Sequence, residues 1–205
     1  MASSAMAEEC GTVTVAEMNW ASAGAISQID KIILENGYGC TVELVSGDTM
    51  PTFTSMNEKG EPDMAPELWI NAVREPLDKA VAEGSLIIGG EILNEGGVEG
   101  FWVPTYIAEE HDIYTVKDAL AHPELFPGAE DESKGAFFTC PAGWNCRITT
   151  GNLFRAFGFD KGGFELVDPG SAAGLDGALA KANERKEGWL GYYWAPTAIL
   201  GKYDM

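Results

Sequence analysis

The chain has 205 residues, of which 45% are hydrophobic and 22% charged, so it can bury a core in one large domain or two small lobes. Asp and Glu number 32 against 13 Lys and Arg, which gives a formal net charge of −19. This charge repels phosphate backbones and anionic lipid, so we expect no nucleic-acid partner. The longest apolar runs, such as 86–88, fall far short of the roughly 20 residues that span a bilayer, so no direct membrane insertion is expected.

The first ninety residues alternate strand and helix patterns. Residues 12–18 predict a strand, apolar residues three and four apart between 25 and 33 predict a helix ending at Asn36-Gly37, and 41–45 predict a second strand. A strand, helix and strand within roughly thirty-five residues is typical of a parallel pair with a crossover helix. The sequence therefore predicts an α/β fold.

Further elements follow on both sides of a glycine-rich stretch at 89–97, which is our candidate boundary between two lobes. Before it, Pro66 is expected to open a helix with Trp69 on its apolar face, and 85–88 to form a short buried strand. After it we expect helices at 116–121, 149–157 and 171–186 and a strand at 188–194. The predicted division is 1–9 tag or mature N-terminal tail, 10–98 lobe one, 99–198 lobe two and 199–205 the start of a return to lobe one.

The four cysteines fall into two pairs. Cys140 and Cys146 are six residues apart with no histidine nearby to complete a zinc site, which favours a disulfide. Cys10 and Cys40 each precede a predicted strand, so they can be bridged if those strands are parallel neighbours. Two disulfides indicate an oxidising compartment.

No catalytic constellation is present in the sequence. The two histidines, His111 and His122, lie in polar helix-like segments without a serine or cysteine elbow nearby, which favours the surface. The glycine-rich segments lack the G-x-G-x-x-G spacing of a phosphate-binding loop. We therefore expect no enzyme activity and no required cofactor.

Six tryptophans stand out, at positions 20, 69, 102, 144, 189 and 194. Trp20 follows the first predicted strand, Trp144 lies inside the cysteine loop, and Trp194 ends a strand. Ligands of parallel α/β sheets bind outside the carboxyl ends of strands, and an aromatic face attracts a trimethylammonium group by ~1–2 kcal/mol when desolvated. The alternative is core packing, which we expect for Trp189 and which periodicity also favours for Trp69.

Four segments resemble the substrate-binding proteins of glycine betaine, choline and proline betaine ABC importers, and the resemblance covers nearly the whole chain. These segments are Glu17-Met18-Asn19-Trp20, Pro66-Glu67-Leu68-Trp69, Cys140-Pro141-Ala142-Gly143-Trp144-Asn145-Cys146 and the run from Gly191 to Lys202 with its Trp194-Ala195-Pro196-Thr197. Within that family the chain is most similar to the trimethylamine N-oxide binding proteins of marine bacteria. The resemblance implies a two-lobed type II periplasmic binding fold, a periplasmic location, a monomer and delivery of the ligand to a membrane permease.

The resemblance also implies which residues bind. Trp69, Trp144 and Trp194 match the family's cage tryptophans, and Trp20 and Trp102 are cleft candidates that could add a wall. In relatives that bind carboxylates the loop after the cage tryptophan offers backbone N–H groups, here those of Asn145 and Cys146. Some relatives carry a basic side chain one helical turn after the first cage tryptophan; here that turn holds Val73 and Arg74, a departure that argues against a side-chain clamp on a carboxylate. Members usually return to lobe one, whereas this chain stops at Met205, so the closing part of lobe one is expected to be missing.

Two acidic features complete the candidate site. Some relatives carry a calcium-type loop before the cysteine loop, and Glu130, Asp131 and Glu132 could supply part of a structural calcium site, although a solvated acidic turn is favoured. For the polar end of the ligand, Arg147 is the nearest basic side chain. A carboxyl group near the cage, Glu99 or secondly Glu17, would suit an N-oxide better than a betaine carboxylate, unless both are ordinary surface or hinge acids.

These observations favour a transport protein for a small methylated amine, with trimethylamine N-oxide preferred and glycine betaine or choline as the alternative. Two other classes stay open: an enzyme that acts on a quaternary amine, and a structural or adhesion module that uses its tryptophans only for packing.

Overall fold

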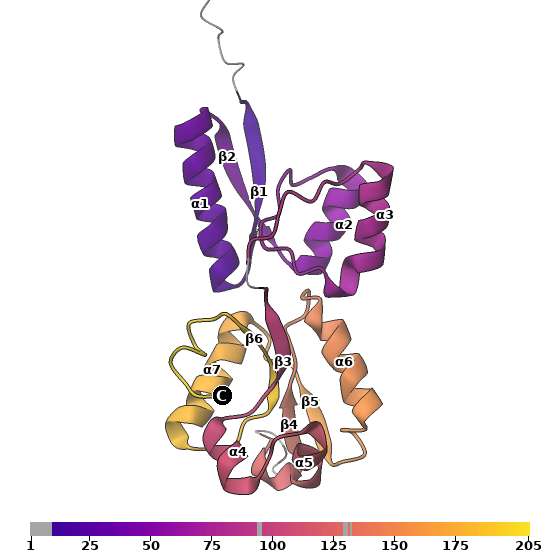
Figure 1. Ribbon diagram of the computed structural model, residues 1–205, viewed down its shortest axis with the longest axis vertical. Helices are drawn as coiled ribbons and strands as arrows, with labels where there is room; N and C mark the ends of the chain where they lie inside the picture. Colours follow the sequence, from indigo (N-terminus) through magenta and orange to yellow (C-terminus); the bar gives the residue numbers. More distant parts are fainter. Residues whose placement is uncertain (1–9, 94–95, 129–130, 132) are drawn as a thin grey trace, which may run out of the picture. The chain divides into compact units, whose positions relative to one another are not determined.

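The computed structural model describes residues 10–93, 96–128, 131 and 133–205. The chain divides into two compact units, Met1–Ile92 and Leu93–Met205, and each is an α/β unit with helices packed on a sheet (Figure 1). The expected α/β class is therefore confirmed. No helix in the described part of the chain is both long enough and apolar enough to cross a membrane.

The first unit is built on the predicted parallel pair. Strands β1 (Thr12–Met18) and β2 (Thr41–Gly47) run side by side in register, Thr12 opposite Thr41 and Met18 opposite Gly47, and α1 (Ala21–Tyr38) connects them. The helix continues past Asn36-Gly37 because the left-handed conformation that closes it is adopted by Gly39, at φ 72°. The disulfide between Cys10 and Cys40 joins the starting ends of the two strands, as expected.

Two further helices cover the other face of this sheet. Helix α1 lies on one side of β1 and β2, and α2 (Thr49–Lys59) and α3 (Arg74–Glu83) lie on the other (Figure 1). A short 3-10 helix, η1 (Asn71–Val73), leads into α3. Their apolar side chains form a small cluster of Phe53, Val73 and Leu77.

Two expected elements of this unit are wrong. No helix begins at Pro66: residues 66–67 form a turn, residues 68–70 are coil, and Glu67 adopts a left-handed φ of 55° that no α-helix contains. The expected strand at 85–88 is coil, with Ile87 91% exposed. Short apolar runs do not distinguish a buried strand from a loop when no neighbouring strand pairs with them.

The second unit contains a four-stranded sheet in the order β3-β6-β4-β5. Its strands are β3 (Val98–Trp102), β4 (Gly135–Phe138), β5 (Phe164–Val167) and β6 (Gly191–Ala195). Edge strand β3 runs antiparallel to β6, while β6, β4 and β5 are parallel. The expected strand at 188–194 corresponds to β6, whereas β4 and β5 were not expected because four residues carry almost no periodicity.

Helices lie on both sides of this sheet, with α6 on one side and α4 and α7 on the other (Figure 1). They are α4 (Thr105–His111), α5 (Val116–Ala121), α6 (Cys146–Phe157) and α7 (Ala172–Arg185), with the 3-10 helix η2 (Pro123–Leu125). The three expected helices are thus present. The helix expected from residue 149 begins at Cys146, the second half of the Cys140–Cys146 disulfide, which was also expected.

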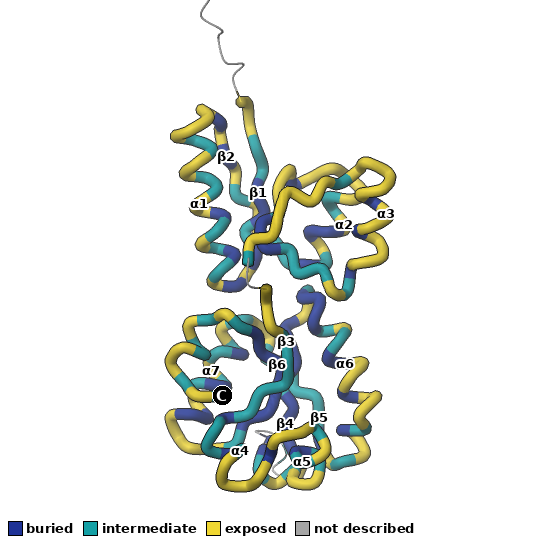
Figure 2. The backbone as a smooth tube through the Cα atoms, in the orientation of Figure 1, coloured by how far each residue is buried: buried dark blue, intermediate teal, exposed yellow. Residues whose placement is uncertain are grey.

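Aromatic rings fill the core of the second unit. Phe137 and Phe159 are fully buried with their centroids 5.0 Å apart, and Trp189 is 2% exposed and stacks on Phe138 at 5.7 Å. The core placement expected for Trp189 is therefore confirmed. The central strands β4 and β6 are largely buried, whereas β3 and β5 are mainly intermediate, and the outer helix faces are exposed (Figure 2). Both histidines lie at the surface, as expected.

The last residues of the chain contact the second unit. The hydroxyl of Tyr203 donates to Glu184 of α7 at 3.0 Å, and the main-chain N–H of Thr105 donates to the carbonyl of Asp204 at 3.1 Å. Residues 199–205, which the sequence suggested as the start of a return to lobe one, are hydrogen-bonded here to α7 and α4.

Gly188 leads into β6 where the chain passes against another backbone segment, and a Cβ there would lie 1.7 Å from the carbonyl oxygen of Leu125. Changing Gly188 to Ala should therefore lower the free energy of unfolding by about 1–3 kcal/mol or more. Gly177 on α7 is the matched control, because nothing lies within 4 Å of its added Cβ, and there Ala should stabilise by about 0.5–1 kcal/mol. Urea denaturation of both variants measures this, and equal stabilities would contradict the packing.

Candidate functional site

The first unit brings two of the candidate tryptophans onto one carboxylate. Trp20 directly follows the turn after β1, occupies the N-cap position of α1 and is 6% exposed. Its indole Nε1–H donates to Oε1 of Glu67 at 2.7 Å, and the indole of Trp69 donates to the same oxygen at 3.1 Å. The hydroxyl of Ser22 adds a third hydrogen bond at 2.8 Å. Glu67 therefore joins two segments that lie 47 residues apart in the sequence.

Sequence reasoning missed Glu67 as a site residue. Among 32 acidic residues it carries no distinguishing pattern except its place in the Pro66-Glu67-Leu68-Trp69 segment that carries the family resemblance. An acid two residues before a candidate cage tryptophan was the signal that could have identified it.

A hollow of about 410 Å³ lies at the carboxyl ends of β1 and β2. Its polar lining includes Glu17, Asn19, Ser46 and Asp48, and the amide of Asn19 donates to Asp48. Burial raises the pKa of the Asp48 carboxyl, and the Asn19 hydrogen bond opposes that rise. Glu17, the second acid that the sequence suggested, accepts a hydrogen bond from Gln28 at 3.1 Å. The hollow is thus lined by carboxylate acceptors, and one of its lining residues, Asn19, directly precedes Trp20 in the sequence.

The second unit groups the other two cage candidates. The rings of Trp144 and Trp194 meet edge to face with centroids 5.2 Å apart, and Tyr192 lies nearly parallel to Trp194 at 6.2 Å. Trp144 is 5% and Trp194 6% exposed, so both rings are buried. The indole nitrogen of Trp194 is buried and donates to no described residue.

Glu99 lies beside this aromatic cluster. It is directly opposite Trp194 in the β3–β6 pairing, and its Oε1 accepts the hydroxyl proton of Tyr192 at 2.7 Å. Burial raises the pKa of Tyr192 far above its usual value, and the nearby Glu99 charge raises it further. Glu99, Tyr192, Trp194 and Trp144 therefore form one connected group, which we call the Glu99 cluster.

The remaining binding candidates have different surroundings. Trp102 lies opposite Gly191, at the other end of the β3–β6 pairing from Glu99, and its indole donates to the carbonyl of Tyr193 at 3.0 Å. Asn145 is 2% exposed at the N-cap of α6, and Cys146 is the first residue of that helix. Their backbone N–H groups thus lie at the N-terminal end of α6, where the first N–H groups of a helix have no acceptor within that helix.

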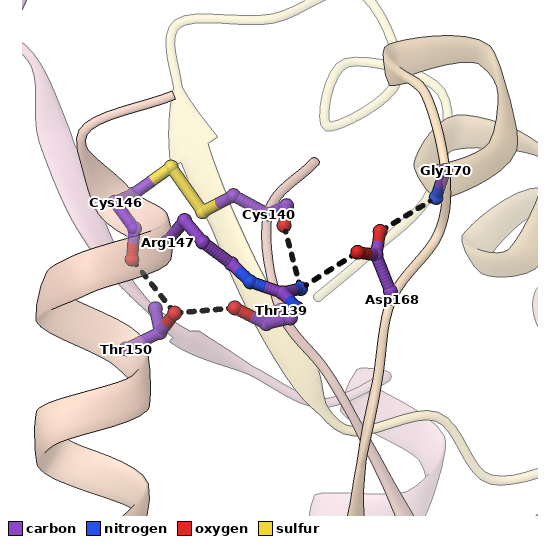
Figure 3. A network of polar contacts seen from close by, with 7 residues as sticks. All are labelled: Thr139, Cys140, Cys146, Arg147, Thr150, Asp168 and Gly170. Carbon is purple, nitrogen blue, oxygen red and sulfur yellow. Dashed lines mark hydrogen bonds and ion pairs between the residues drawn. A yellow bond between two sulfur atoms is a disulfide. The ribbon is translucent and has the colours of Figure 1, made fainter. Parts of the chain in front are cut away.

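Arg147 is held by its own unit (Figure 3). Its guanidinium contacts Asp168 at 3.1 Å and donates to the carbonyl of Cys140 at 3.3 Å. The same helix turn is anchored by Thr150, which donates to the carbonyl of Cys146 at 2.7 Å and contacts Thr139. The disulfide and these bonds fix the loop that carries Trp144, while the charge of Arg147 is neutralised by Asp168.

The calcium hypothesis concerns residues of which only one is described. Glu130 and Glu132 lie outside the described residues. The carboxylate of Asp131 accepts bonds from the backbone and hydroxyl of Ser133 and lies 3.7 Å from Lys134. Within the described ranges no three His, Cys, Asp or Glu side chains are grouped closely enough to hold a metal ion.

Both groups place aromatic rings next to a carboxylate: Glu67 accepts hydrogen bonds from two indoles, and Glu99 accepts one from Tyr192 beside Trp194. Aromatic rings and an anionic charge each attract a positively charged alkylammonium group.

The comparison with known families agrees. Residues 11–205 match the substrate-binding domain of ABC-type glycine betaine transport systems, and the chain belongs to this family. It is a family of solute-binding proteins rather than of enzymes, in line with the expectation from the sequence.

Solved structures show the same fold at low sequence identity. An ABC-transporter choline-binding protein in an unliganded semi-closed conformation matches with a TM-score of 0.73 and 22% identity, over 96% of this chain and 64% of that one. Lactococcal OpuAC complexed with glycine betaine matches at 0.69 and 20%, over 95% and 68%. A glycine betaine/L-proline-binding protein from Borrelia burgdorferi matches at 0.68 and 19%, over 94% and 66%. The chain thus spans under two thirds of the length of the choline-binding protein.

The Tyr192–Glu99 contact predicts a pH dependence of stability. Because burial and the Glu99 charge raise the folded-state pKa of Tyr192 above its unfolded value of about 10, its stabilising contribution is complete below pH 10. It is lost as the pH rises towards the folded pKa, because only the unfolded chain releases the proton. Changing Tyr192 to Phe should therefore flatten the fall of unfolding free energy above pH 10 by about 1.4 kcal/mol per pH unit. Urea denaturation between pH 8 and 11 measures this, with Tyr114→Phe, an exposed tyrosine, as control; equal slopes in wild type and Tyr192→Phe would contradict it.

Proposed function

We propose that this protein is the solute-binding component of an ABC importer, that it captures a small methylated amine, and that trimethylamine N-oxide is its preferred ligand. The observation that carries the proposal is that aromatic rings lie beside a carboxylate in both units: Glu67 accepts the indole N–H groups of Trp20 and Trp69. In the second unit Glu99 accepts the hydroxyl proton of Tyr192 and lies opposite Trp194 in the β3–β6 pairing. The binding residues are the tryptophans of these groups, Trp20, Trp69, Trp144 and Trp194. The protein acts as a periplasmic monomer that delivers its ligand to a membrane permease.

The choice of ligand follows from its polar end. A betaine carboxylate needs several donors, yet Arg147 is already paired with Asp168 and the acids beside the rings repel a second carboxylate. An N-oxide carries one small oxygen that can share a proton with a carboxyl group. Glycine betaine and choline remain the alternative ligands, because one matched structure is a complex with glycine betaine and another is a complex with choline.

The aromatic cage is tested by replacing its rings with an apolar side chain. Trp144→Leu and Trp194→Leu keep apolar bulk but remove the ring quadrupole, so each should weaken ligand binding by about 1–2 kcal/mol or more. Isothermal titration calorimetry with trimethylamine N-oxide, glycine betaine, choline and carnitine measures the affinities. Trp189→Leu is the control, because that ring packs on Phe138 in the core; it should lower stability without lowering the affinity of the folded protein. Unchanged affinity in both cage variants would exclude the cage, and NMR detection of a converted ligand would favour an enzyme.

The choice of ligand is tested separately. We expect the wild-type protein to bind trimethylamine N-oxide more tightly than glycine betaine, and Glu99→Ala to lower the affinity for the N-oxide by about tenfold. Glu165→Ala is the control for charge, because its carboxylate belongs to β5 at the far edge of the same sheet. Equal or tighter binding of glycine betaine by the wild type would assign the protein to the general betaine importers.

A further inference from the structure

We propose that Glu67 is the residue that sets cation selectivity in the first unit: one carboxylate oxygen positions the indoles of Trp20 and Trp69, and the carboxylate supplies the negative charge that the ligand's ammonium group neutralises. This inference rests on the proposed function. It assigns a role to a residue that sequence reasoning did not select.

The positioning role follows from the hydrogen bonds of Oε1. Both indole N–H groups and the Ser22 hydroxyl donate to this single atom, at distances from 2.7 to 3.1 Å. Each indole is attached to the backbone at one side, and its hydrogen bond restrains the N–H edge at the other. Two rings bonded to one oxygen atom therefore have a fixed relation to each other. Aromatic faces bind a cation well only when they are oriented in advance.

The backbone conformation of Glu67 supports a functional role. Three non-glycine residues of the described chain have a positive φ, and two of them, Asp112 and Lys186, close helices α4 and α7. Glu67 closes no helix, yet it adopts φ 55°, a conformation that costs about 1 kcal/mol or more for such a residue. The surrounding contacts must hold it, and they direct its side chain inward to the two indoles.

The charge role follows from the second oxygen. Glu67 is 6% exposed, and its Oε2 is buried and accepts no hydrogen bond from any described residue. The ion pairs found among the described residues do not include Glu67 either. A buried carboxylate with half of its acceptor capacity unused is unfavourable by itself, and a cation against the adjoining rings would offset that cost.

The chemical class of the ligand follows from this arrangement. The buried carboxylate carries a negative charge, so an additional anionic group would be repelled, whereas a compact alkylammonium group adds the missing positive charge without needing a hydrogen bond. The electrostatic attraction between the Glu67 carboxylate and the ligand is strongest for a full cation. It is smaller for an N-oxide, whose negative oxygen is bonded directly to the nitrogen and cancels part of the field.

The experiment separates the two roles with two variants. Glu67→Gln keeps an acceptor oxygen for the indoles but removes the charge, and Glu67→Leu removes both. Calorimetry of the full chain with tetramethylammonium and with trimethylamine N-oxide measures the charge role, and ¹⁹F NMR of protein labelled with 5-fluorotryptophan measures the positioning role. Trp20→Phe and Trp69→Phe assign the two resonances, and Glu43→Gln, an exposed acid on β2, controls for net charge.

We expect Glu67→Gln to weaken tetramethylammonium binding by about tenfold or more and trimethylamine N-oxide binding by less, with both indole resonances little changed. Glu67→Leu should weaken both ligands and shift or broaden the Trp20 and Trp69 resonances alone. If the wild type binds these ligands and Glu67→Gln binds them equally well, the charge role is wrong while the proposed function stands. If the wild type binds no methylated amine, the proposed function and the charge role fail together. Unchanged fluorine spectra of ligand-free Glu67→Leu would overturn the positioning role in either case.

Discussion

The structure depends on how it satisfies the polar edges of buried aromatic rings. Indole N–H and phenol O–H groups lose their water when the rings are buried, and each unpaired group costs free energy. In this acidic chain several of the acceptors are carboxylates: Glu67 for Trp20 and Trp69, and Glu99 for Tyr192. The rings are thereby held in place, and negative charge lies at their polar edges. The carboxylates that accept these hydrogen bonds therefore also supply negative charge that can attract a cation.

The sheet topology determines where these groups occur. In the first unit the parallel register aligns Met18 with Gly47, so the segments carrying Trp20 and Asp48 leave the sheet at the same edge. In the second unit the antiparallel edge strand β3 sets Glu99 opposite Trp194. A strand parallel to β6 at this position would have required a different connection. A shift of the β3–β6 register by one residue would turn Glu99 to the other face of the sheet, so the observed register is what brings this acid to the ring.

The sequence predicted the elements with long, regular patterns and missed those fixed by tertiary contacts. Strand β1 and the helices α1 and α7 carry clear periodicity, so their positions were predicted well. The helix expected at Pro66 failed because Glu67 is held in a left-handed conformation by bonds to residues 45 and 47 positions away. No local pattern encodes such a contact. For the same reason Glu67 could not be separated from the other acids, whereas Glu99 and the tryptophans could be selected from motif and position.

The balance of donors and acceptors constrains the ligand more than the aromatic rings do. Indole faces accept any methylated ammonium group, whether its other end is a hydroxyl, a carboxylate or an N-oxide oxygen. Glu67 and Glu99 act as acceptors beside the rings, and Arg147, which follows the Trp144 loop, is neutralised by Asp168 and held by the carbonyl of Cys140. A ligand with a free carboxylate would have to use backbone N–H groups at the start of α6 against the field of nearby acids. A compact ligand that carries no carboxylate meets no such opposition, so the carboxylates rather than the tryptophans are the groups that select among methylated amines.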